Sequence, residues 1–240
     1  MTNEEFSNAF DTLLSSHATD AMYGEGVSIR DIVLDEYEKS LYLTRAQEEI
    51  VSSLYDGKNA LGDAFESSEE IRRYLSNLVE EATEDPIKTS DGKPLGLESN
   101  SKFFTLPEDL WFITYEAVST DGTGCAKKAS MRVYPVKQDE YQVIRDNPFR
   151  GTNNRRALRL DLSDGVVEII CKFNVTKYYV RYVRKLKPII LVDLPNGLSI
   201  NQESIETPCE LHESLHSIIL ERAVTLAIQS KSYTQRTTTT

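Results

Sequence analysis

Apolar residues recur at helical spacing in three stretches of the first 82 residues. The first stretch covers residues 3–16. The second runs from about residue 29 to Tyr55, with a capping-box pattern at Ser28 and Asp31. The third covers residues 69–80 and follows Ser68. Each stretch has one apolar side, so the pattern predicts amphipathic helices. The apolar positions are Phe6, Phe10, Leu13 and Leu14; Ile32, Val33, Tyr37, Leu41, Tyr42, Ala46, Ile50, Leu54 and Tyr55; and Ile71, Tyr74, Leu75 and Leu78.

The pattern changes beyond residues 83–101, a turn-rich stretch with two prolines and two glycines that predicts a linker or an ordering loop. After it, short segments rich in aromatic and β-branched residues alternate with turn signals such as Ser163-Asp164-Gly165. A short helix or loop is expected between them, over residues 136–147. The predicted strands are residues 106–120, 127–136, 157–162, 166–174 and 178–185.

A third pattern begins near residue 207. Thr207 is predicted as the N-cap of a final helix, with Pro208 at its first position and Glu210 at its third. The helix is expected to end near Gln229, because residues 230–240 lack apolar periodicity. That tail is predicted to be mobile, or to become ordered on a partner.

These patterns together predict an α+β fold. Sequential strands joined by short turns favour a mainly antiparallel sheet or sandwich. The predicted organisation is an acidic helical region at 1–82, a linker at 83–101, a β-rich region with the C-terminal helix at 102–229, and a flexible tail at 230–240.

Bulk composition narrows the class of protein. No apolar run approaches the ~20 residues needed to span a bilayer, and the N-terminus lacks the apolar core of a secretory signal. The three cysteines, Cys125, Cys171 and Cys209, are widely spaced and odd in number, which favours reduced thiols. We therefore expect a protein made in a cytoplasm, with no membrane partner.

Charge is unevenly distributed along the chain. Residues 1–100 carry 22 acidic and 8 basic residues, whereas residues 101–240 carry 16 acidic and 19 basic residues. So acidic a first half would repel phosphates and disfavours non-specific binding to nucleic acid. Well-solvated helices, or a surface that must not adhere to nearby DNA, would both explain it.

One segment matches the sequence motif of a metal site. His212, Glu213 and His216 match the HExxH pattern of zinc-dependent hydrolases, in which two histidines bind zinc and the glutamate acts as base. A third ligand is missing, because His17 is far away in the sequence and Glu221 follows on the same predicted helix. We interpret the motif as ordinary helix surface and predict no catalytic residue, metal or other cofactor. A zinc hydrolase is the alternative.

A cluster of arginines falls in the segment RDNPFRGTNNRRALRL at 145–160. It can be interpreted as part of a nucleic-acid-binding module, together with the aromatic and basic strand at 178–185, or as a charged contact between copies of the chain. The acidic first half favours the second interpretation. The candidate subunit-interface residues are Arg145, Arg150, Arg155, Arg156 and Arg159.

Four segments resemble ring proteins of the head–tail connector of podoviruses, in particular the crAss-like phages of gut Bacteroidales. They lie at 36–57, 103–118, 132–160 and 178–227. The resemblance implies a structural protein without catalytic residues. It further implies a ring of about twelve copies between the portal protein and the neighbouring tail or ring proteins. Such a ring, assembled in the host cytoplasm into the neck or tail of the virion, would surround the DNA ejection channel without specific DNA binding.

Overall fold

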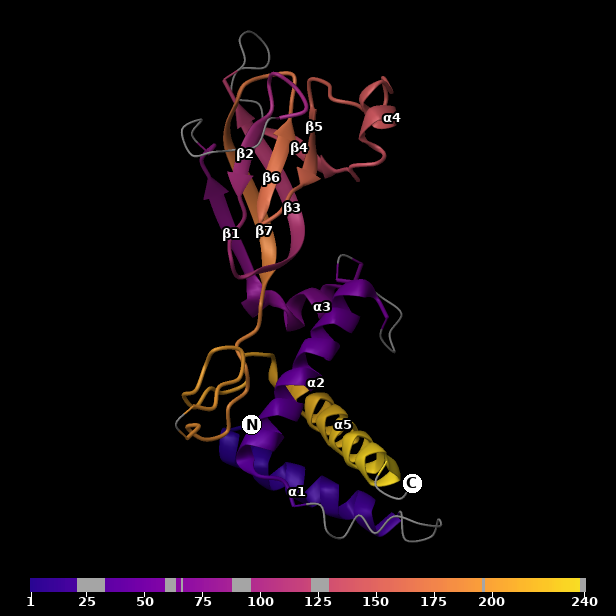
Figure 1. Ribbon diagram of the computed structural model, residues 1–240, viewed down its shortest axis with the longest axis vertical. Coiled ribbons are helices and arrows are strands. Elements are labelled where there is room, and N and C mark those ends of the chain that lie inside the picture. Colours follow the sequence, from indigo (N-terminus) through magenta and orange to yellow (C-terminus); the bar gives the residue numbers. More distant parts are fainter. Residues whose placement is uncertain are drawn as a thin grey trace. The chain divides into compact units, whose positions relative to one another are not determined.

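The computed structural model describes residues 1–20, 33–58, 64, 65, 67–87, 96–121, 130–195 and 197–237. The predicted capping box at Ser28 and Asp31, most of the turn at 121–124, and Cys125 lie outside the described residues. The chain forms two compact units (Figure 1). A helical unit combines residues 1–77 with 186–240, and a β unit comprises residues 78–185.

The helical unit contains α1 (Asn3–Asp20), α2 (Glu36–Asp56), α3 (Glu69–Tyr74) and α5 (His216–Thr237). Helices α1, α2 and α5 contact one another through apolar stripes. The most deeply buried members of these stripes are Phe6 and Phe10 of α1, Leu43, Ala46 and Val51 of α2, and Ile219, Ala223, Val224 and Ala227 of α5. Burial of such side chains is the main favourable term in folding this unit.

The second helix starts later than its periodicity predicts. Residues 33–35 are not helical, and α2 begins at Glu36 because the carboxylate of Asp35 accepts a hydrogen bond of 2.7 Å from the backbone nitrogen of Glu38. Gly57 ends α2 at φ 75°, a left-handed conformation that glycine adopts without strain. The predicted end at Asp56-Gly57 is thus confirmed and the predicted start is wrong.

The last helix also starts later than predicted. Thr207 does not cap a helix, because its backbone nitrogen and oxygen both bond to Ile190 at 3.0 Å. A short 3₁₀ turn (Glu213–Leu215) leads instead into α5, which continues to Thr237. The stretch from 230 to 237, predicted to be a flexible tail, is therefore helical. Helix α5 packs on α1 and α2, whereas the sequence grouped it with the β-rich region.

A polar stripe on α2 binds the backbone of the returning chain. Gln47 donates to the carbonyl of Lys187 at 2.7 Å, and the hydroxyl of Ser40 accepts from the nitrogen of Leu191 at 3.0 Å. Between them, the Thr44 hydroxyl accepts from the nitrogen of Ile189 at 3.1 Å and donates to its carbonyl at 3.3 Å. All three side chains are buried at one-turn spacing, so they replace the water that residues 187–191 would otherwise bind.

The β unit is a seven-stranded sheet in the order β1-β7-β3-β4-β5-β6-β2. All neighbours are antiparallel except β4 and β5, which are parallel. The sheet curls, and the nitrogen of Ile87, after β1, donates to the carbonyl of Phe103 in β2 at 2.8 Å. The α+β prediction and the mainly antiparallel sheet are confirmed. The strands are β1 (Val79–Glu84), β2 (Lys102–Thr105), β3 (Leu110–Thr120), β4 (Ser130–Pro135), β5 (Arg156–Asp161), β6 (Val166–Ile170) and β7 (Val175–Arg184).

Strand β1 was predicted to be helix and linker. Helix α3 stops at Tyr74, a 3₁₀ turn (Ser76–Leu78) follows, and Val79 starts the strand. The pairing with β7 outweighs local helix propensity, because Glu81 forms an ion pair with Arg181 and Glu80 with Arg184 across the two strands. Among the described residues, no helix is long and apolar enough to cross a membrane.

The polar stripe of α2 can be tested with Thr44→Val. Valine has nearly the same shape but leaves the nitrogen and carbonyl of Ile189 buried without partners, so we expect a loss of about 1–3 kcal/mol in the free energy of unfolding. Urea titration followed by helical circular dichroism measures it. The control is Thr12→Val on the exposed side of α1, where the hydroxyl bonds only its own helix, and a change within about 0.5 kcal/mol is expected. Equal losses in both variants would contradict the assigned role.

Candidate subunit-contact surface

The HExxH residues do not form a metal-binding helix face. His212 precedes the helix with φ −59° and ψ 142°, and its Nδ1 accepts a hydrogen bond of 3.3 Å from the nitrogen of Ser214. Its ring also packs against Tyr74, with ring centroids 5.5 Å apart. Glu213 is exposed. In the HExxH motif both zinc-binding histidines project from one face of the same helix, whereas here only His216 is helical.

His216 has a structural role inside the helical unit. Its Nε2 lies 3.0 Å from the carbonyl oxygen of Leu211, its Nδ1 lies 2.9 Å from the nitrogen of Met1, and its ring packs on Phe6. Both ring nitrogens therefore have partners in the protein. Burial lowers the pKa of His216, and the neighbouring positive charge of Met1 acts in the same direction. In the part of the chain that the structure describes, no group of three potential metal ligands occurs.

This environment makes the helical unit sensitive to acid. Because the pKa of folded His216 lies below its ordinary value of ~6.5, the unfolded chain binds more protons, and stability falls as the pH drops below that value. We expect His216→Gln to reduce the loss of melting temperature between about pH 7 and about pH 5. His212→Gln, at an exposed position, is the control and should leave the loss in place. A wild-type slope in the His216 variant would refute this assignment.

The arginine segment at 145–160 follows α4 (Tyr141–Arg145). This helix packs on the sheet through two residues. Tyr141 and Ile144 are buried against Leu158, Leu160 and Ile170. This contact directs the remaining side chains of α4 outward, among them Val143, which is 75% exposed. The loop that follows carries Phe149, which is 84% exposed.

The loop after α4 is held by hydrogen bonds along its length. The side-chain oxygen of Asn147 accepts from the nitrogens of Phe149 at 2.9 Å and Arg150 at 3.1 Å. Gly151 is buried, and a Cβ there would lie 2.8 Å from the carbonyl oxygens of Arg145 and Asn147. Only glycine fits at that close approach. The exposed Phe149 therefore sits on an ordered turn.

Arg156 holds the same loop from the other side. Its guanidinium donates to the carbonyl of Phe149 at 2.6 Å and lies over the ring of Tyr134, 4.5 Å from its centroid. Arg156 is thus a structural residue of the loop. Arg150 and Arg155 are exposed, and among the described residues no ion pair involves either of them. We call Val143, Phe149, Arg150 and Arg155 the basic anchor.

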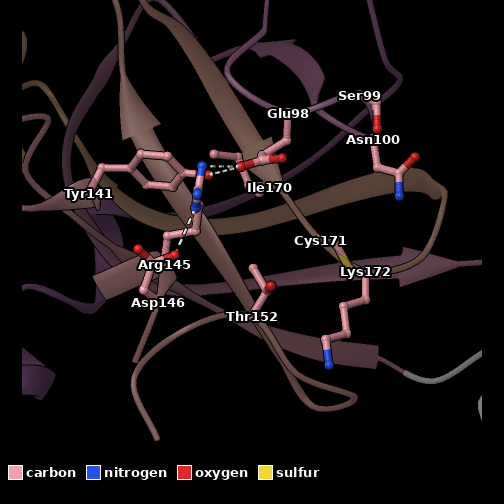
Figure 2. Close-up of a pocket in the computed structure, with 10 residues that line it drawn as sticks. All are labelled: Glu98, Ser99, Asn100, Tyr141, Arg145, Asp146, Thr152, Ile170, Cys171 and Lys172. Atoms are coloured by element: carbon pink, nitrogen blue, oxygen red, sulfur yellow. Dashed lines mark hydrogen bonds and ion pairs between the residues drawn. The ribbon is translucent and has the colours of Figure 1, made fainter. Parts of the chain in front are cut away.

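Arg145 lines a polar pocket of about 440 Å³ (Figure 2). Its guanidinium lies 3.3 Å from the Glu98 carboxylate and 3.1 Å from Asp146, and the Tyr141 hydroxyl donates to the same Glu98 oxygen at 3.0 Å. Burial and Glu98 together raise the pKa of Tyr141. Arg145 thus meets its own chain's acids, which makes it a weaker candidate for contact with a second chain.

The pocket lacks the groups of a nucleophilic active site. Cys171 lines it, but burial raises the pKa of this thiol, and none of the lining residues that the structure describes is a histidine. A cysteine nucleophile needs a lowered pKa or an adjacent base. The lining also includes Lys172, Asn100 and Thr152.

Arg159, predicted at the surface contact, is buried inside the β unit. Its Nη1 lies 2.5 Å from the Glu116 carboxylate, whose other oxygen accepts from the Tyr178 hydroxyl at 2.8 Å, and its Nε lies 3.0 Å from Asp161. Side chains alternate between the two faces of β5, and Arg159 lies with Ala157 on the inner face of the curled sheet. The arginine cluster in the sequence did not show which of its members face inward. Burial and the charge of Glu116 raise the pKa of Tyr178.

The buried pair gives a contrast between two arginines of one segment. Arg159→Leu leaves the Glu116 carboxylate buried without its cation, and we expect a loss of about 3–5 kcal/mol in the free energy of unfolding. The exposed Arg150→Leu is the matched control and should change stability by less than about 0.5 kcal/mol. Denaturant titration of both variants makes the comparison. Similar stabilities would contradict the assignment of Arg159 to the core.

The aromatic strand proposed for nucleic-acid stacking is an interior strand. β7 lies between β1 and β3, and Tyr178, Val180 and Tyr182 are buried. Arg181 on the other face of β7 pairs with Glu81 of β1, and Arg184, on the same face as Tyr182, pairs with Glu80. Bases could not stack on these buried rings without unfolding the sheet.

The comparisons with known proteins agree with one another. A family model described as phage tail ring protein 3/4 matches residues 1–240. Ring protein 3 of Bacteroides phage crAss001 is 49% identical over 235 residues, which cover 97% of this chain and 97% of that protein. Ring protein 4/5 of the same phage is 32% identical over 236 residues, covering 95% and 92% of the two chains. The resemblance noted in the sequence is confirmed.

Proposed function

The chain belongs to the phage tail ring protein 3/4 family, and we propose on this premise that it is a structural, non-enzymatic subunit of a ring in the neck or tail of a crAss-like phage. The observation that carries this proposal is the 49% identity to Ring protein 3 over 97% of both chains.

We further propose a closed ring of about twelve copies between the portal protein and a neighbouring tail or ring protein. A ring of identical chains needs two different surfaces that fit each other, because each copy contacts the next head to tail. The two units of this chain differ in the required way. The helical unit holds 22 acidic and 10 basic residues, a net charge of −12, whereas the β unit holds 16 acidic and 17 basic residues, a net charge of +1.

Within the β unit, the basic anchor is the surface best suited to a subunit contact. Arg150 and Arg155 are exposed without ion pairs among the described residues, and Phe149 of the same loop supplies an exposed apolar group. Aromatic and arginine side chains carry much of the energy of protein interfaces. Of the five arginines predicted there, the proposal keeps Arg150 and Arg155, because Arg145, Arg156 and Arg159 already make contacts within the chain.

The negative helical unit suits a conduit for DNA. A wall of basic residues would bind the duplex by counterion release, whereas an acidic wall repels phosphates and lets the duplex slide. We propose that the ring surrounds the ejection channel and assembles in the host cytoplasm. The same charge argues against the alternative of a nucleic-acid-binding module.

Native mass spectrometry of the chain, alone and mixed with the portal protein, tests this function. We expect metal-free closed oligomers, formed by the chain itself or after the portal nucleates them. Arg150→Glu combined with Arg155→Glu should lower the ring population at least about tenfold, because like charges then face each other across the contact. The control is Lys137→Glu with Lys58→Glu, two well-exposed lysines of the two units, and it should assemble normally.

Two results would count against the proposal. A stable monomer in the presence of the portal protein and adjacent ring proteins would oppose a ring function. A monomer with one zinc per chain would instead favour the hydrolase alternative at His212, Glu213 and His216.

A further inference from the structure

The segment between β7 and α5 forms a compact lobe at residues 186–211 (orange in Figure 1). A tight turn reverses the chain at Asn201 and Gln202, whose φ angles of 49° and 70° give the two left-handed residues of a type I′ turn. The nitrogen of Leu194 donates to the carbonyl of Ser204 at 2.8 Å, and Asn201 donates to Glu48 of α2 at 3.1 Å. The lobe is therefore fixed to the helical unit.

This lobe exposes apolar side chains that its own unit does not cover. Ile205 is 67% exposed, Val192 is 52% exposed and Leu198 is 40% exposed. Single exposed apolar residues are ordinary, but three on one small, ordered lobe are typical of a protein contact. We call Val192, Asp193, Leu198, Glu203 and Ile205 the acidic lobe face.

The charge of this lobe is mainly negative. Residues 186–211 contain four acidic residues, Asp193, Glu203, Glu206 and Glu210, and one basic residue, Lys187. Asp193 and Glu203 are exposed. The basic anchor of the β unit has the opposite charge, with two exposed apolar residues and two arginines that form no ion pair among the described residues. The two surfaces complement each other in charge and both offer apolar area.

We infer that the basic anchor of one copy docks on the acidic lobe face of the neighbouring copy. The inference rests on the proposed ring function and names the partner of its contact surface. Phe149 and Val143 bury apolar area against Val192, Leu198 and Ile205, while Arg150 and Arg155 meet Asp193 and Glu203 of the other copy. A closed ring requires such a pair of unlike surfaces on every chain, and these two belong to different units.

The build of both surfaces favours association. The Asn147 turn, the Arg156 contacts and the packing of Gly151 hold Phe149 in place before binding, so little conformational entropy is lost on docking. The lobe turn is ordered in the same way. A nucleic acid is a poor alternative occupant of the basic anchor, since Phe149 and Val143 offer phosphates nothing and a net charge of −11 repels the strand.

A charge-swap cycle on the full chain tests the pairing, measured as the ring population in native mass spectrometry with the portal protein present. Arg155→Glu and Glu203→Lys should each lower the ring population about tenfold. The chain with both changes should recover to within about threefold of wild type, because every contact then again joins opposite charges. Phe149→Ser and Ile205→Ser test the apolar part and should each reduce assembly.

Matched controls lie elsewhere on each unit. Leu97→Ser, at a position 56% exposed in the β unit, and Val33→Ser, at a position 87% exposed in the helical unit, should assemble as wild type. Circular dichroism of each variant checks that the fold is unchanged.

The outcomes separate this inference from the proposed function. If the wild-type chain forms rings and the double charge swap is no better than the two single changes, the anchor and the lobe face do not meet, and the inference is overturned while the ring function stands. If the wild-type chain forms no ring with its partners, the proposed function itself fails.

Discussion

The helical unit depends on the hydrogen bonds that buried side chains of α2 form with the backbone of residues 187–191, where the chain re-enters this unit after the β unit. After the β unit, residues 187–191 lie along α2 outside the seven-stranded sheet, so their backbone groups need other partners. Ser40, Thr44 and Gln47 bind them instead, at the buried side of the helix. With the chain held there, the lobe folds back onto Asn3 and Glu48, and α5 starts where it can pack on α1 and α2.

That constraint also separates two kinds of surface. The β unit is inserted between the two parts of the helical unit, so its sheet folds around its own core, with the Arg159–Glu116–Tyr178 contact inside. Two arginines of the loop that follows α4, Arg150 and Arg155, are exposed. The helical unit has a net charge of −12, whereas the β unit has a net charge of +1. A chain built in this way presents surfaces of opposite character from separate units, a combination well suited to head-to-tail assembly.

Much of the fold could be predicted because its signals are local. Helical periodicity located α1, α2 and α3, turn chemistry separated β5 from β6, and short connections indicated antiparallel pairing. The errors fall where distant partners decide. Val79–Glu84 is helical by propensity but pairs with β7, and Thr207 has the residues of a helix cap but bonds to Ile190. No local pattern contains those partners.

The candidate site shows the same limit at the level of side chains. The sequence identified the arginine cluster, yet it could not tell which arginines point outward, because Arg159 lies on the inner side of β5 and Arg156 is used by the loop. The apolar members were missed for a related reason. Nothing in the sequence around Phe149 or Ile205 indicates an exposed position. Only the structure shows that their side chains are exposed to solvent on backbone held by hydrogen bonds.

An exposed phenylalanine on a constrained turn is unfavourable for an isolated chain, because it adds apolar area that water must solvate and offers nothing to the fold. The same group becomes favourable once a second surface covers it. The same reasoning applies to Arg150 and Arg155, because exposed charges add little to the stability of the folded chain and can instead contribute to binding. The α2 stripe and the buried Glu116 contact therefore add to the stability that apolar burial gives this chain, while the exposed residues of the basic anchor and the acidic lobe face can contribute to assembly.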